Sequence, residues 1–239
     1  MYGGGLVITR GVTLRGMGEA AAEVEIKGTS RMDPGVAILN PERSEDSFAV
    51  AFQNLTLPNR HPAKRHGVEV EGTAAIVLKD AFVVGGLTYV LVLRDQQRAQ
   101  ITSTSIVDTK LGVLIEDSSE AILVDSVLAD SASKATGASS VTIEGCDLSN
   151  NDVLVSAHVT MDVLGSVLDR SEILIQVNAN VSFASCSFSY MTGAISVSGS
   201  SPARFEECDI SHCQPAGFDH ATGLRVRGAT VVEVQGCTF

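Results

Sequence analysis

Apolar and polar residues alternate along most of this chain in repeated copies of one short pattern. In the stretch Val141–Leu148, two apolar residues stand two positions apart, and a small residue and a further apolar residue follow after a polar turn. A second apolar pair, such as Val153 and Val155, follows most copies. Each copy therefore predicts two short strands separated by turns of Gly, Ser, Asn and Asp. The small residue recurs at a period of 20 to 22 residues, at Thr104, Ser126, Cys146, Ser166, Cys186 and Cys208.

A fixed repeat of this length predicts a stacked solenoid, in which each coil forms hydrogen bonds to the next. Helical coils are disfavoured, because the apolar residues stand at i and i+2 and because Val, Ile, Thr and Ser are frequent. The Leu-x-x-Leu-x-Leu frame of a leucine-rich repeat is absent from the sequence. We therefore predict an all-β fold, a right-handed parallel β-helix of about nine coils. Residues 1–47 are expected to form irregular coils of the same solenoid, and residues 48–239 its regular repeats.

The units Ser140–Asn151 and Asn180–Ser189 resemble the parallel β-helix repeat of the pectate-lyase-like superfamily. The resemblance implies this fold but no single function. The superfamily includes polysaccharide lyases, hydrolases and epimerases, phage tailspikes, and intracellular β-helix modules of ubiquitin-ligase subunits and cytokinesis scaffolds. The catalytic signatures of its polygalacturonases, alginate epimerases and pectate lyases are not recognisable in this sequence. An enzymatic function is therefore disfavoured.

Charge and composition narrow the classes of partner. A formal net charge of −11 disfavours duplex nucleic acid and anionic membranes, which bind clustered Lys and Arg. No apolar run is long enough for a transmembrane helix, and no secretory segment opens the chain. We therefore expect a cytoplasmic protein, or an extracellular one if the chain is an excerpt of a longer protein.

Cysteine positions and ligand spacing bear on redox state and metal binding. Four of the five cysteines occupy the inward small position and only Cys213 lies in a turn, so we expect free thiols. The possible metal ligands His212, Cys213, Asp219 and His220 are spaced as in no known zinc site. We therefore predict neither a metal site nor a cofactor.

The second strands of the repeat carry apolar residues at outward as well as inward positions. A strand with one exposed face alternates, whereas a continuous apolar run indicates that both faces are covered. We therefore expect a protein-binding face here. Neither end of the chain supplies a capping segment, which leads us to expect part of a larger protein or an assembly of subunits. The outward apolar residues are Val92, Leu114, Leu154 and Leu174.

A column of turn residues, four positions after the small residue, is the other candidate site. It contains Asp108, Asp130, Asn150, Arg170, Tyr190 and His212. Stacked carboxylates beside Arg and Tyr are what a sugar-binding or acid–base groove requires, with Asp108, Asp130 and Arg170 as the catalytic candidates. Turn chemistry is the competing interpretation, because Asp and Asn side chains form hydrogen bonds with the local backbone.

Two long corner loops offer further contact residues, because loops on a rigid scaffold often carry function. Their polar residues are Arg60, His61, Lys64 and Arg65 in the first loop, and His212, Asp219 and His220 in the second.

Two hypotheses about function follow. The preferred one is a non-catalytic interaction or scaffold module, which binds a protein partner or neighbouring subunits through the apolar strand face and the corner loops. The alternative is a carbohydrate-binding or carbohydrate-active β-helix that uses the turn column. A sugar groove would be polar with aromatic platforms, and this chain has no Trp and only three Tyr.

Overall fold

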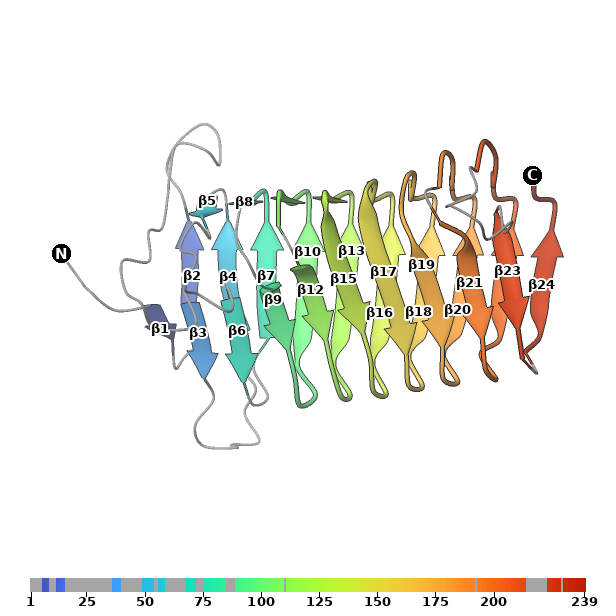
Figure 1. Cartoon of the computed structure of the whole chain (residues 1–239). Coiled ribbons are helices and arrows are strands. Elements are labelled where there is room, and N and C mark those ends of the chain that lie inside the picture. Colours follow the sequence, from blue (N-terminus) through green and yellow to red (C-terminus); the bar gives the residue numbers. More distant parts are fainter. Residues whose placement is uncertain are drawn as a thin grey trace.

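The computed structural model describes residues 6–8, 12–15, 36–39, 49–53, 56–58, 68–71, 75–84, 89–109, 111–191, 193–213, 223–228 and 230–239. In this part of the chain, short strands wind into coils that stack along one axis, with the first strands at one end and the last at the other (Figure 1). None of the described residues is helical, so none belongs to a helix that could cross a membrane.

Two long sheets and one short sheet form the faces of the coil, and neighbouring strands pair in parallel. Sheet A contains β1 (Leu6–Ile8), β3 (Val36–Leu39), β6 (Val68–Glu71), β9 (Tyr89–Leu93), β12 (Leu111–Ile115), β15 (Ser131–Ala135), β17 (Asn151–Ser156), β19 (Ile173–Gln176), β21 (Ile195–Ser198) and β23 (Leu224–Arg227), in that order. Sheet B contains β2 (Val12–Arg15), β4 (Ala49–Gln53), β7 (Ala75–Lys79), β10 (Arg98–Thr102), β13 (Glu120–Val124), β16 (Ser140–Glu144), β18 (Thr160–Leu164), β20 (Asn180–Ala184), β22 (Ala203–Glu206) and β24 (Val232–Gln235). Sheet C contains β5 (Thr56–Pro58), β8 (Phe82–Val84), β11 (Ser105–Val107) and β14 (Val127–Ala129), and single bridges continue it toward Thr238.

Adjacent coils pair in register, so that equivalent residues stack. In sheet B, Val141 pairs with Met161 and Ile143 with Val163, and all four lie in one continuous core. The prediction of an all-β parallel β-helix is confirmed. Each long sheet holds ten strands among the described residues, where the sequence predicted about nine coils.

The small residues of the repeat form a buried file at the corner between sheets B and C, as predicted. The backbone N–H of Thr104 donates to Ser126 Oγ at 3.2 Å, and that of Cys146 donates to Ser166 Oγ at 3.1 Å. The hydroxyl of Ser126 in turn donates to the carbonyl two residues before it, at 2.8 Å. A small polar side chain in this file therefore donates a hydrogen bond within its own turn and accepts one from the coil before it.

The five cysteines are free. Burial raises the pKa of the Cys146 thiol, and a hydrogen bond with the Cys186 thiol, together with burial, raises the pKa of Cys208. The sequence placed Cys213 in a turn, but its half-buried side chain packs against the core, and burial raises its pKa. These three thiols stay protonated at neutral pH and pack as compact hydrophobic groups.

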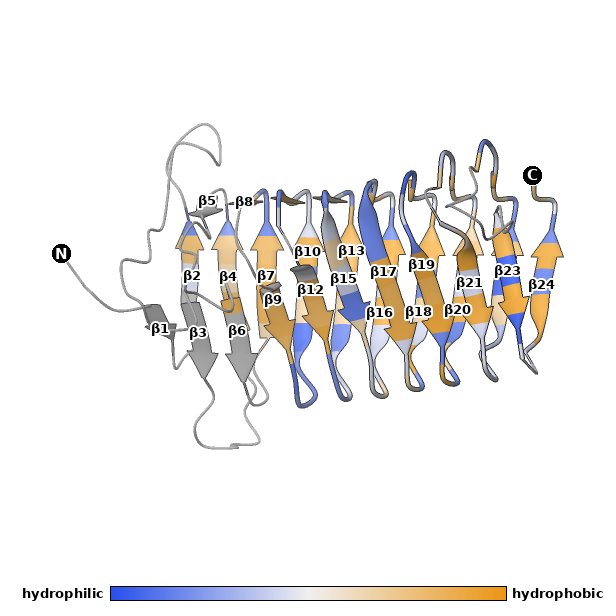
Figure 2. Ribbon diagram, in the orientation of Figure 1, coloured by the Kyte–Doolittle hydropathy of each residue, from blue (hydrophilic) through white to orange (hydrophobic). Residues whose placement is uncertain are grey.

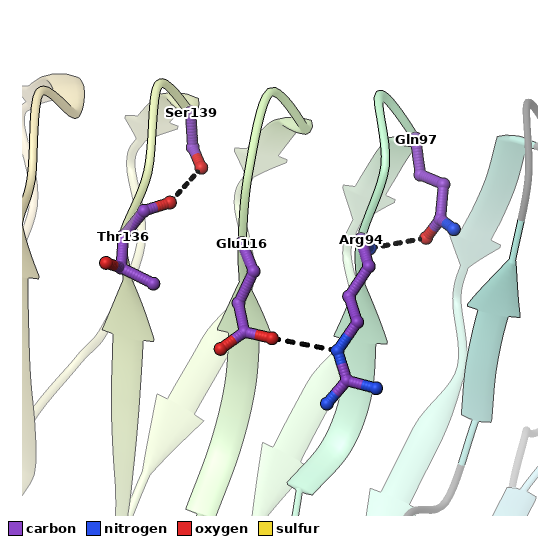
Figure 3. Close-up of polar contacts among 5 residues, drawn as sticks. All are labelled: Arg94, Gln97, Glu116, Thr136 and Ser139. Atoms are coloured by element: carbon purple, nitrogen blue, oxygen red, sulfur yellow. Dashed lines mark hydrogen bonds and ion pairs between the residues drawn. The ribbon is translucent and has the colours of Figure 1, made fainter.

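Polar turns close the coils at the corner between sheets A and B (Figure 3). Within one turn, the backbone N–H of Arg94 donates to Gln97 Oε1 at 2.8 Å. Two coils further on, Ser139 Oγ donates to the carbonyl of Thr136 at 2.6 Å. Between neighbouring coils, Arg94 Nε donates to Glu116 Oε2 at 2.8 Å. In each of these turns, a side chain thus forms a hydrogen bond with a backbone group three residues before it.

Gly137 lies in a turn of this corner where another coil approaches closely. Its φ is +78°, and a Cβ there would lie 2.6 Å from the backbone of Asp117. We expect Gly137→Ala to lower the free energy of unfolding by more than about 2 kcal/mol, because a backbone clash adds to the cost of left-handed geometry. Gly165→Ala is the matched control, since Gly165 has a φ of +57° but no atom within 4 Å of the added Cβ. Urea unfolding measures both variants, and equal losses would contradict the steric explanation.

Substitution of Cys186 tests whether the small residues of the repeat lie in the interior. Its side chain is 2% exposed. We expect Cys186→Asp to lower the free energy of unfolding by about 3 kcal/mol or more, because it buries a carboxylate with no cation beside it. Cys186→Ser is the control, because Ser126 and Ser166 occupy the same file, and we expect it to cost less than about 1 kcal/mol. Thermal melts that do not separate the two variants would contradict the assignment.

Candidate functional site

The outer face of sheet A carries five residues that pair with one another from coil to coil. Val92 pairs with Leu114, Leu114 with Lys134, Lys134 with Leu154, and Leu154 with Leu174. We name these five residues the outer ladder. The apolar residues that flank each member in sequence belong to the core, so the members themselves point outward.

Lys134 is the member that the sequence reasoning missed. The copy that contains it lacks the apolar pair by which the other second strands were recognised. The interval of 20 residues between Leu114, Lys134 and Leu154 is the signal that could have located it. The apolar face predicted from Val92, Leu114, Leu154 and Leu174 therefore contains a cation near its middle.

The two ends of the outer ladder differ in exposure. Val92 and Leu114 are 0% and 3% exposed, although both lie outside the core cluster of the interior. Lys134, Leu154 and Leu174 are half-buried. The accessible part of the outer ladder therefore consists of these last three residues, and their role in binding a partner stays a prediction.

A shallow hollow lies over the accessible part of the outer ladder. Leu154 and Leu174 contribute its apolar surface, together with Ala132 and Lys134. Asp152 and Glu172 also line it; both are exposed, and the backbone N–H of Glu172 donates to Asp152 Oδ1 at 3.1 Å. The hollow thus combines aliphatic side chains with one cation and two anions.

Strand β15, which carries Lys134, differs from its neighbours on both faces. Figure 2 shows it as a largely hydrophilic strand between β12, which is largely hydrophobic, and β17, whose second half is hydrophobic. Its inward positions hold Ser133 and Ala135, and a cavity of about 30 Å³ remains beside them in the core. Ser133 Oγ accepts a hydrogen bond from Asn151 Nδ2 at 3.3 Å. This polar strand marks the boundary between the inaccessible and accessible parts of the outer ladder.

The turn column is a file of exposed residues with left-handed backbone. The φ values lie between 52° and 57° at Asp108, Asp130, Asn150, Arg170, Tyr190 and His212. Left-handed geometry suits Asp and Asn, which supports the turn-chemistry interpretation for the first three residues. It is unusual for long side chains and costs each of them roughly 1 kcal/mol. All six side chains are exposed, so the column is an open ridge.

Two pairs of side chains interact along this column. Asn150 Nδ2 donates to Asp130 Oδ1 at 3.1 Å. The rings of Tyr190 and His212 stack, with centroids 5.2 Å apart and planes inclined by 16°. His212 stands four positions after the small residue Cys208, so it belongs to the turn column as well as to the second corner loop. Asp108, Asp130 and Arg170 are not brought into one enclosed site, so the structure adds no support for their catalytic role.

The remaining candidates are the corner-loop residues. Arg60, His61, Lys64, Arg65, Asp219 and His220 lie outside the described residues. Within the part of the chain that is described, no group of three or more His, Cys, Asp or Glu side chains is arranged to hold a metal ion.

Comparison with known proteins identifies one family. Residues 66–239 match the family model described as "right handed beta helix region", which supports the expected handedness of the coil. No curated protein matches the chain. A solved structure, the pentapeptide repeat protein HetL involved in heterocyst differentiation regulation in the cyanobacterium Nostoc sp. strain PCC 7120, shows 10% identity over 80% of this chain and 86% of its own. Its TM-score is 0.22, and at that value the likeness carries no argument.

The turn-chemistry interpretation is testable with conservative substitutions. We expect Asp108→Asn and Asp130→Asn to change the free energy of unfolding by less than about 0.5 kcal/mol, because Asn tolerates left-handed geometry and keeps an acceptor for Asn150. Chemical denaturation measures the stability, and a panel of polysaccharides measures lyase and hydrolase activity. An activity that either substitution abolishes would overturn the non-catalytic interpretation of the column.

Proposed function

This chain belongs to the right-handed β-helix family, and we propose that it is a non-catalytic interaction module that binds a protein partner through the outer face of sheet A. The observation that carries the proposal is the pair Leu154 and Leu174. These two leucines stand side by side on neighbouring strands at outward positions, and both retain solvent exposure. Removing such aliphatic surface from water contributes about 25 cal/mol per Å², which the entropy lost on association partly offsets.

The outward positions of sheet B are mostly polar at the same coils. Ser140, Thr142, Glu144, Thr160 and Asp162 are polar and exposed, and Leu164 is the apolar residue among them, 49% exposed. A surface that only separates the core from water would be polar on both sheets. The contrast between the two sheets therefore supports a binding face on sheet A rather than a surface on which apolar residues occur anywhere.

The construction of the face also suits binding. Leu154 and Leu174 lie on strands that are hydrogen-bonded to neighbours on both sides. A partner therefore meets a backbone that is already ordered, and little conformational entropy is lost on association. The free thiols of the chain are compatible with a reducing compartment such as the cytoplasm.

A carbohydrate ligand at the turn column is the second candidate. The exposed ring stack of Tyr190 and His212 favours it, since an aromatic face beside hydrogen-bonding groups is a surface on which sugars can pack. Glycan-array binding that Tyr190→Asn abolishes would favour this candidate over the protein-binding face.

The proposal is tested by placing charge on the apolar face. In the double variant Leu154→Lys/Leu174→Lys, we expect the affinity for the protein partner to fall by at least about 100-fold, because two ammonium groups must be buried at the centre of the contact. The partner is identified by quantitative mass spectrometry of proteins that co-purify with the tagged chain. It is then purified and titrated against each variant by calorimetry.

The matched control is Ser140→Lys/Thr160→Lys, which adds the same charge at paired outward positions of sheet B. We expect this control to bind as the unmodified chain does, and circular dichroism checks that both variants are folded. If the leucine variant keeps its fold, its oligomeric state and every partner, the outer face of sheet A is not the interface.

A further inference from the structure

We propose that the cavity in the core beside β15 is a binding site for a small uncharged apolar molecule, such as a dissolved gas or a short hydrocarbon. The site lies inside the coil, behind the strands whose outer face is proposed to bind a protein partner. Its occupation therefore does not depend on that partner.

The site arises where one coil lacks the bulky inward side chains of its neighbours. The inward residues of β15 include Ser133 and Ala135. Ser133 pairs with Val153 of the next coil, and Ala135 pairs with Ile115 of the coil before and with Val155 of the next. Branched side chains therefore lie above and below a small one, and a cavity of about 30 Å³ remains between them.

The stacked coils keep the surrounding side chains from closing this space. β15 pairs in register with β17 from Ser131 to Ala135, which holds the two coils at the spacing of paired strands, about 4.8 Å. On the side of sheet C, Leu128 and Leu148 line the cavity, and both belong to the continuous core. A void with such walls stays open, because close-packed neighbours relax only partly toward it.

The chemistry of the walls selects an apolar ligand. The lining residues are apolar apart from Ser133 and Lys134. Ser133 Oγ already accepts a hydrogen bond from Asn151 Nδ2 at 3.3 Å, and Lys134 lies at an outward position of its strand. A buried water requires roughly two to four polar partners, whereas an apolar cavity binds apolar atoms such as xenon. Since a water-sized group occupies about 10–15 Å³ of cavity volume, this cavity has room for about two heavy atoms or for one xenon atom.

Sheet A offers a short route of entry. Ser133, Lys134 and Val153 line both the cavity and the hollow on the outer face, so a single layer of strands separates the two. Among the described residues, β15 pairs with β12 over two residue pairs and with β17 over five. Local opening breaks the fewest hydrogen bonds where pairing is shortest. A small molecule therefore enters between β12 and β15.

Methyl NMR of the full chain under increasing xenon pressure tests the inference, with xenon as the ligand. We expect saturable shifts of the methyl resonances that line the cavity, among them those of Ile115, Leu128 and Met161. Methyl groups of the core further along the stack, such as those of Val197, should keep their positions.

The variants Ala135→Val and Ala203→Val separate filling of the cavity from a general change in packing. Both alanines are buried in the core, at 6% and 3% exposed, but only Ala135 lines the cavity. We expect Ala135→Val to abolish the xenon shifts and to raise the melting temperature, because the added methyl groups occupy the free space. Ala203→Val should keep the xenon shifts and lower the melting temperature, because it overpacks the core around it.

Three results would overturn the inference: no saturable shift, shifts spread evenly over the chain, or shifts that persist in folded Ala135→Val. Circular dichroism checks the folding of both variants, and the titration of the unmodified chain decides the question even if a variant does not fold. A chain that binds no xenon, but binds a protein partner that Leu154→Lys/Leu174→Lys loses, would remove this inference and leave the proposed function intact.

Discussion

The structure depends on hydrogen bonds between parallel coils in register. These bonds continue from the strands through the corners. The backbone N–H of Asp125 donates to the carbonyl of Glu144 at 2.9 Å, and that of Gly145 donates to the carbonyl of Leu164 at 3.0 Å. Each coil is therefore held at the spacing of paired strands, about 4.8 Å from the next. In the described strands, each paired residue consequently lies next to its equivalent one repeat later, and the repeat in sequence becomes a set of straight files in space.

This constraint decides what each file can contain. An inward file must pack against itself, and Phe183 and Phe205, from adjacent coils, do so with ring centroids 5.1 Å apart. An exposed file can pair unlike groups, as Asn150 does with Asp130. In the file that places Asp152 beside Glu172, Asp152 Oδ1 accepts a hydrogen bond from the backbone N–H of Glu172 at 3.1 Å. That file lines the hollow over Leu154 and Leu174, so charged and apolar groups lie on the same face.

Strand β15 shows how one coil can depart from the repeat without breaking it. Its register with β17 is kept from Ser131 to Ala135. Because the backbone supplies the hydrogen bonds, the side chains are free to change, at the expense of a small cavity in the core. Strand β15 also places Lys134 on the outer face. The strand whose inward side chains pack less tightly is therefore the one that adds a charge to the outer ladder. We regard this coil as the point at which the outer ladder becomes accessible.

The apolar pattern of the sequence predicts the fold class, the two long sheets, the inward file from Thr104 to Cys208 and the outward apolar positions of sheet A. Alternation and period are local properties, and in-register stacking carries them directly into space. The sequence does not predict which part of the outer ladder is accessible, since the exposure of Val92 and Leu114 depends on what surrounds the sheet, not on their own strands. The three-dimensional structure was also needed to show that Lys134 belongs to the outer ladder and that Arg170 and Tyr190 adopt left-handed backbone. Polar residues and turn conformations carry no periodic apolar signal; pairing with the neighbouring coil places them.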